Sequence, residues 1–136
     1  MGATGEQQGC IRTVLAEGQP AVRDALRDLM THGLGMQVVG EARTLQTLQR
    51  QVQALRPDLA IVDWDLLAQS ASVLAGLRVW SPGLRVVVMG LRPEMRPAAL
   101  AAGADGFFSK VDAPEVVVGV LQACPKAIGE TTGGLS

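Results

Sequence analysis

The chain has 136 residues and a formal net charge of −1, with 48% hydrophobic and 18% charged residues. This composition predicts one globular domain with a hydrophobic core and excludes a disordered chain. The apolar runs are too short to cross a membrane, the N-terminus is too polar for a signal peptide, and no basic surface for nucleic acid stands out. We therefore expect a cytoplasmic protein.

The cysteines and the histidine argue against metal and redox chemistry. Cys10 and Cys124 form no CxxC pair and match no metal-ligand spacing, so we expect two ordinary reduced thiols. His32 has no partner in the sequence, which excludes most zinc sites and most histidine-dependent catalysis.

Segments typical of strands and helices alternate along the chain. One helix begins at Pro20 and ends at Gly33 or Gly35, and another is capped by Thr44. The run Val116–Val118 favours a strand on propensity alone, but the helix-start signal before it and the alternation favour a helix ending at Pro125. The predicted strands are 11–16, 36–42, 59–63, 84–89 and 105–109, and the predicted helices are 20–33, 45–55, 71–80, 95–102 and 112–124.

The stretch 57–65 is central to the prediction. Four apolar residues form a short strand buried on both faces, and this strand ends abruptly at Asp63. An ionised carboxylate at that position is costly to desolvate unless a cation pairs with it. The alternative is an aspartate that only caps the next turn.

The alternation predicts an α/β fold: a flavodoxin-like, doubly wound, five-stranded parallel sheet of order 2-1-3-4-5 with helices on both faces. In that order the carboxyl ends of strands one, three, four and five lie side by side. These ends carry Glu17-Gly18, Asp63, Gly90 and Lys110. Two acids and a lysine at one edge indicate a site.

The sequence resembles the receiver domain of bacterial two-component response regulators, particularly the NarL/FixJ type within the CheY-like superfamily. The matching pieces, in one collinear order over about residues 11–124, are 16–23 (AEGQPAVR), 38–42 (VVGEA), 57–63 (PDLAIVD) and 102–110 (AGADGFFSK). The resemblance implies that Asp63 is the phospho-acceptor position and that Lys110 contacts the phosphoryl group. It also places Phe107 at the aromatic switch position.

Two positions depart from the family pattern. The loop after strand one normally carries two acids, but here they are Glu17 and Gly18, and glycine offers no ligand for Mg²⁺. Strand four normally ends in Thr or Ser, whose hydroxyl binds the phosphoryl group, but here it ends at Gly90. A hydrogen bond to a charged group is worth about 1.5–3 kcal/mol. Without this hydroxyl, a phosphate on Asp63 would do little to stabilise one conformation of the loop after strand four over another.

We therefore interpret the chain as an atypical receiver, or pseudo-receiver, with a degraded Mg²⁺ and phosphorylation site. It would act in transcriptional regulation through protein contacts or dimerisation and would not be an enzyme. The alternative is a conventional phospho-accepting receiver in which Glu17 or Asp65 holds the metal with Asp63. If Asp63 is not modified, Lys110 is equally well explained as a surface lysine before a helix.

The sequence gives less support to other functions of this fold. A flavin or cobalamin site lacks support because no phosphate-binding loop follows strand one and His32 has no DxHxxG context. A purely structural dimerisation module stays open. Phe107 and Phe108 point to opposite faces, so one is expected in the core and the other exposed, while Trp64 is expected half-buried beside the site.

The expected organisation is a flexible tail at 1–10, the receiver at 11–126, and a tail or linker start at 127–136. Expected partners are a histidine kinase or another signalling protein and a second copy of the chain. DNA would be contacted only through an output domain absent from this sequence. The chain is expected to be either an excised receiver or a stand-alone module.

Overall fold

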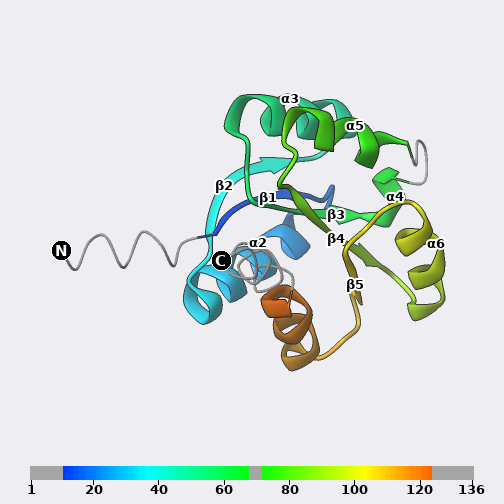
Figure 1. Ribbon diagram of the computed structural model, residues 1–136. Coiled ribbons are helices and arrows are strands. Elements are labelled where there is room, and N and C mark those ends of the chain that lie inside the picture. Colours follow the sequence, from blue (N-terminus) through cyan, green and yellow to red (C-terminus); the bar gives the residue numbers. More distant parts are fainter. Residues whose placement is uncertain (1–10, 68–71, 124–136) are drawn as a thin grey trace, which may run out of the picture.

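The fold is a five-stranded parallel sheet with helices on both faces, seen in a computed structural model that describes residues 11–67 and 72–123 (Figure 1). The strand order is β2-β1-β3-β4-β5, which confirms the predicted doubly wound order. All neighbouring strands pair in parallel. The strands are β1 (Arg12–Ala16), β2 (Gln37–Ala42), β3 (Leu59–Asp63), β4 (Arg85–Gly90) and β5 (Gly106–Ser109).

The helices connect these strands as the sequence predicts, with local differences. They are α2 (Pro20–Leu29), the π-helical turn η1 (Met30–Leu34), α3 (Leu45–Leu55), α4 (Trp64–Leu67), α5 (Val73–Trp80), the 3₁₀ turn η2 (Pro93–Met95), α6 (Arg96–Ala101) and a final helix at 114–123. Helix α4 was not predicted, because four residues are too few to show a helical period. The predicted helix 95–102 is shorter as an α-helix, since Pro97 has no N–H to continue the i→i−4 bonds into η2.

Helix ends follow the signals in the sequence. The Thr44 hydroxyl accepts a hydrogen bond from the Thr47 amide at 3.2 Å, as an N-cap should. Gly35, at φ 65°, ends η1 in the left-handed conformation. The Val116–Val118 run is helical, so the caps outweigh strand propensity here.

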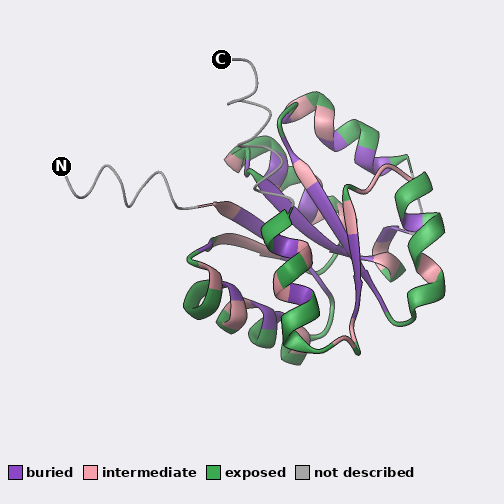
Figure 2. Ribbon diagram, turned by 60° about the horizontal axis from the view of Figure 1, so that its bottom comes forward, coloured by how far each residue is buried: buried purple, intermediate pink, exposed green. Residues whose placement is uncertain are grey.

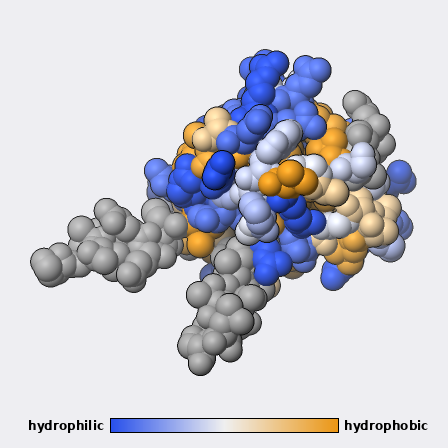
Figure 3. All heavy atoms as spheres, turned by 45° about the horizontal axis from the view of Figure 1, so that its top comes forward, coloured by the Kyte–Doolittle hydropathy of each residue, from blue (hydrophilic) through white to orange (hydrophobic). Residues whose placement is uncertain are grey.

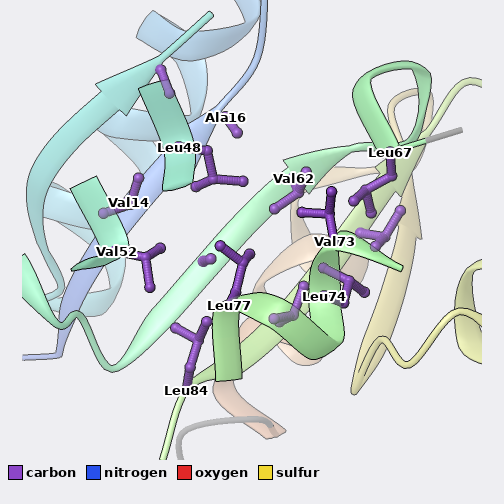
Figure 4. Packing of buried hydrophobic residues seen from close by; sticks show 14 of the residues in the cluster. Val14, Ala16, Leu48, Val52, Val62, Leu67, Val73, Leu74, Leu77 and Leu84 are labelled. Carbon is purple, nitrogen blue, oxygen red and sulfur yellow. The ribbon is translucent and has the colours of Figure 1, made fainter. Parts of the chain in front are cut away.

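Two apolar cores lie on either side of the sheet. One packs α3, α5 and α6 against the strands, and Figure 4 shows Leu48 of α3 and Leu74 and Leu77 of α5 arranged along this face of the sheet. The other packs α2, η1 and the helix 114–123 against the opposite face. Figure 2 shows buried strands between helices whose outer faces are exposed, and Figure 3 shows hydrophilic and hydrophobic side chains interspersed on one outer surface.

One expectation about β5 was wrong. Phe107 and Phe108 point to opposite faces of the sheet, yet both are buried, at 5% and 3% exposure. Helices cover both faces, so each ring enters a different core. Trp64 is half-buried against the first core, as expected.

No helix within the described ranges is long and apolar enough to cross a membrane. The predictions for Cys10, Cys124, the end of the last helix at Pro125 and the two terminal tails fall on residues outside those ranges.

Candidate functional site

Three of the predicted site residues meet at the carboxyl edge of the sheet. Glu17 follows β1, Asp63 ends β3, and Lys110 follows β5. The Lys110 ammonium lies 2.9 Å from Glu17 Oε1 and 3.2 Å from Asp63 Oδ2. The parallel order of the sheet brings these distant segments together, as predicted from the strand ends.

Glu17 is buried, with only 1% of the residue exposed, and its backbone and carboxylate are both held by neighbouring groups. Its backbone amide donates to Ala42 O at 2.9 Å, which continues the pairing of β1 with β2. Its Oε2 accepts a hydrogen bond from the Gln19 amide at 3.0 Å, and Oε1 faces Lys110. Oε2 is therefore hydrogen-bonded, whereas Oε1 pairs with Lys110 by charge and accepts no hydrogen bond within the described residues.

Asp63 is also buried, at 6% exposure. Its Oδ1 accepts a hydrogen bond from the Asp65 amide at 3.3 Å, and its Oδ2 faces Lys110. The predicted turn-capping role of Asp63 is thus present together with its place in the charged cluster. Asp65 itself is exposed and contributes its backbone to the site.

Lys110 is fixed at its backbone and along its side chain. Its amide donates to Gly90 O at 2.7 Å, and its side chain is 14% exposed. Burial lowers the pKa of Lys110, but the Glu17 and Asp63 carboxylates outweigh that effect and raise the pKa overall. Lys110 is therefore a charged member of the cluster and not a solvated surface lysine.

The cluster of Glu17, Asp63 and Lys110 holds two carboxylates and one ammonium. Burial raises the pKa of Asp63, the Glu17 charge raises it further, and Lys110 offsets these effects only in part. The cluster carries one surplus negative charge when both acids are ionised. A further anion on Asp63 would have to be neutralised by groups that the described residues do not place there.

The two departures from the family pattern have different surroundings. A Cβ built on Gly18 would meet no heavy atom within 4 Å, so this side of the cluster is open. A Cβ on Gly90 would lie 2.8 Å from Met95 Sδ and 3.0 Å from Phe107 Cε1. The space at the end of β4 is filled by these two side chains.

The side chains fit a resident Mg²⁺ poorly. Magnesium prefers near-octahedral oxygen ligands and is usually held by one or two carboxylates with waters. Here Glu17 and Asp63 both face the Lys110 ammonium, and position 18 offers no side-chain oxygen. Among the residues that the structure describes, no three potential ligand side chains gather at one point.

Two residues near the site were not singled out from the sequence. The Arg23 Nη1 donates to Glu17 O at 2.8 Å, and its Nε lies 3.3 Å from Glu41 Oε1. The Ser109 hydroxyl donates to Leu91 O at 3.2 Å and so ties together the loops after β4 and β5. Arg23 could have been noticed as a charged residue beside the apolar stripe of α2, whereas nothing local marked Ser109.

A doubly wound sheet with a buried carboxylate and a lysine at its carboxyl edge defines the class of receiver-type signalling domains. The family model described as "Response regulator receiver domain" matches residues 13–122. The chain belongs to this family, whose members are signalling modules and typically bind Mg²⁺. The resemblance seen in the sequence is thereby confirmed.

Similar proteins agree with this assignment. The chain is 36% identical over 108 residues to the transcriptional activator protein ExaE of Pseudomonas putida, covering 77% of this chain and 50% of that protein. It therefore spans about half the length of this curated relative.

Among solved structures, the receiver domain of the response regulator NarL from Mycobacterium tuberculosis superposes with a TM-score of 0.72 at 28% identity, covering 85% of this chain and 96% of that one. A LuxR-family response regulator from Aurantimonas sp. superposes with a TM-score of 0.74 at 25% identity, covering 84% of each chain.

Proposed function

We propose that this receiver domain is a pseudo-receiver whose state is set by protein contacts or dimerisation and not by efficient phosphotransfer to Asp63. One observation carries the proposal. The Lys110 ammonium lies within 3.2 Å of both Asp63 and Glu17, while positions 18 and 90 carry no side chain. The cluster already contains its own cation and lacks two of the groups that would stabilise a phosphoryl group.

The switch positions support the same conclusion. Phe107 is buried and its ring lies against Gly90, where a hydroxyl-bearing side chain would otherwise stand. A phosphate on Asp63 would have no side-chain hydroxyl at the end of β4 with which to form a hydrogen bond. A switch requires an element whose energy differs between two states, and Gly90 offers no such differential contact.

The proposed setting is a two-component regulator of transcription in the cytoplasm. Family membership implies a histidine kinase or another signalling protein as partner, and DNA would be contacted through an output domain in a longer protein. A homodimer is supported by exposed apolar side chains in the segments that follow β4 and β5, namely Leu91, Leu100, Val111 and Val116.

The test is intact mass spectrometry after incubation with acetyl phosphate and Mg²⁺, with Asp63→Asn in parallel. We expect no phosphate adduct on either protein, while a conventional receiver treated in the same way serves as the positive control. A stoichiometric adduct on the wild type alone would overturn the proposal. It would restore the conventional receiver, with Glu17 or Asp65 holding the metal.

A purely structural dimerisation module makes a different prediction. In that case Asp63→Asn and Lys110→Met would leave self-association and partner binding unchanged. A pseudo-receiver whose charged cluster sets the shape of the neighbouring loops should lose partner affinity in the Lys110 variant. Sedimentation velocity and partner titration on the two variants distinguish these functions.

A further inference from the structure

A groove runs between α2 with η1 on one side and the helix 114–123 on the other. Figure 1 shows both helices on the sheet face opposite α3 and α5, with the helix 114–123 in orange. The groove is open to solvent and has a volume of about 770 Å³. Met89 and Phe108 lie at its sheet side, and Ala25, Leu29 and Val117 line its walls.

The dimensions of the groove suit a small molecule. Its α2–η1 wall extends from Ala21 to Gly33, which corresponds to roughly 18 Å at the rise of a helix. The volume of the groove lies in the range of small-molecule sites, about 300–1,000 Å³.

The polar groups of the groove are predominantly acidic. Asp28 is exposed on its wall and forms no ion pair within the described residues. At the other end, Asp112 accepts a hydrogen bond from the Ser109 amide, and Lys110 is already paired with two carboxylates. His32 lines the groove near Asp28, with its Nδ1 3.1 Å from Asp28 O. The net field in the groove therefore favours a positive charge.

We propose that this groove binds a small amphiphile with an apolar body and a positively charged amino group. The apolar body would replace water along Val22, Leu29 and Pro114, which line the groove and are partly or fully exposed, and the amino group would pair with Asp28 or Asp112. Lys110 lines both the groove and the charged cluster, so an occupant would contact the residue that holds Glu17 and Asp63 together. This inference is independent of whether Asp63 accepts a phosphate.

The test is a titration of the ¹⁵N-labelled chain with three matched probes: 4-phenylbutylamine, 4-phenylbutanol and 4-phenylbutanoate. We expect saturable shifts of amides in α2 and the helix 114–123, with the amine binding about fivefold more tightly than the carboxylate. Asp28→Asn should bring the affinity for the amine closer to that for the alcohol. Equal binding of amine and carboxylate, or shifts confined to other elements, would overturn the proposal.

A filling variant checks that the probes bind in the groove. Ala25 lies on the wall and is exposed, so Ala25→Phe should occupy the space without disturbing the core. Binding of all three probes should then be lost, while Ala101→Phe, at an exposed alanine of α6, should retain it. Retained binding in Ala25→Phe would overturn the proposal. Saturation of the groove by an amphipathic Leu/Lys peptide, with no effect of the amine, would overturn it in favour of a protein partner.

Discussion

The ring of Phe107 occupies the space that a side chain at Gly90 would need. A Cβ at residue 90 would lie 3.0 Å from Phe107 Cε1 and 2.8 Å from Met95 Sδ. Such contacts force one of these side chains to move. The Phe107 and Met95 side chains therefore pack directly against the backbone of Gly90 at the end of β4.

Gly90→Ala should accordingly destabilise the domain. Alanine in a strand gains about 0.5–1 kcal/mol over glycine from chain entropy, but overpacking costs about 1–3 kcal/mol. We expect a net loss of about 1 kcal/mol, measured by urea unfolding. In a Met95→Ala background the loss should shrink, because the closest contact is gone. An equal loss in both backgrounds would contradict this packing.

Lys110→Met should destabilise the domain by about 2–3 kcal/mol. It leaves the carboxylates of Glu17 and Asp63 facing each other in a buried site without their cation. The matched control is Arg92→Met, at an exposed arginine with no ion pair in the described part of the chain, which should change stability little. Similar unfolding curves for both variants would show that the cluster does not stabilise the fold.

Asp63→Asn should stabilise the domain at neutral pH. Burial and the Glu17 charge raise the pKa of Asp63 in the folded state above its ordinary value. The folded state therefore holds the proton more tightly, and stability falls as pH rises through the window between the two values. We expect a gain of up to about 1 kcal/mol at pH 7 that shrinks towards pH 4.

Thermal unfolding across this pH range measures the effect. Asp65→Asn, at an exposed position, should show no such dependence. A variant at Asp63 that is less stable than wild type at pH 7 would indicate that the ion pair with Lys110 outweighs the burial and the repulsion.

Gly18→Asp should create a divalent-cation site. A Cβ at residue 18 meets nothing within 4 Å, so an aspartate fits without displacing a neighbour. It would add a carboxylate beside Glu17 and Asp63, and hard cations respond strongly to ligand charge. We expect Mg²⁺ affinity by calorimetry to rise at least about tenfold, with Gly18→Asn giving a smaller gain. Unchanged affinity would mean that Lys110 still excludes the ion.

Asp105 connects the start of β5 to α5 and β4, and its loss should be costly. Its Oδ2 lies 2.6 Å from Arg78 Nη2 and accepts a hydrogen bond from the Val86 amide at 2.8 Å, and its Oδ1 lies 3.4 Å from Arg85 Nη1. Asp105→Ala should lose about 2 kcal/mol. Asp105→Asn keeps an acceptor for Val86 and should lose about half as much. Equal losses of stability in the two variants, measured by urea unfolding, would show that the ion pairs with Arg78 and Arg85 account for the whole effect and that the hydrogen bond to Val86 contributes nothing.

The sequence by itself determined the fold and which strand ends meet at the candidate site. Local signals in the sequence include the buried run before Asp63, the N-cap at Thr44 and the alternation of strand-like and helix-like spacing of apolar residues. The parallel strand order that follows from this alternation brings the strand ends together. The absence of side chains at Gly18 and Gly90 could also be read directly from the chain.

Only the tertiary structure decided how these residues meet. The burial of both Phe107 and Phe108 depends on helices covering both faces, which no local pattern around β5 records. The distances from the Lys110 ammonium to Glu17 and Asp63, and the filling of the space at Gly90 by Phe107, arise from side chains far apart in sequence. Such contacts depend on how the sheet and its helices pack, because side-chain positions are fixed by neighbours in space and not by neighbours along the chain.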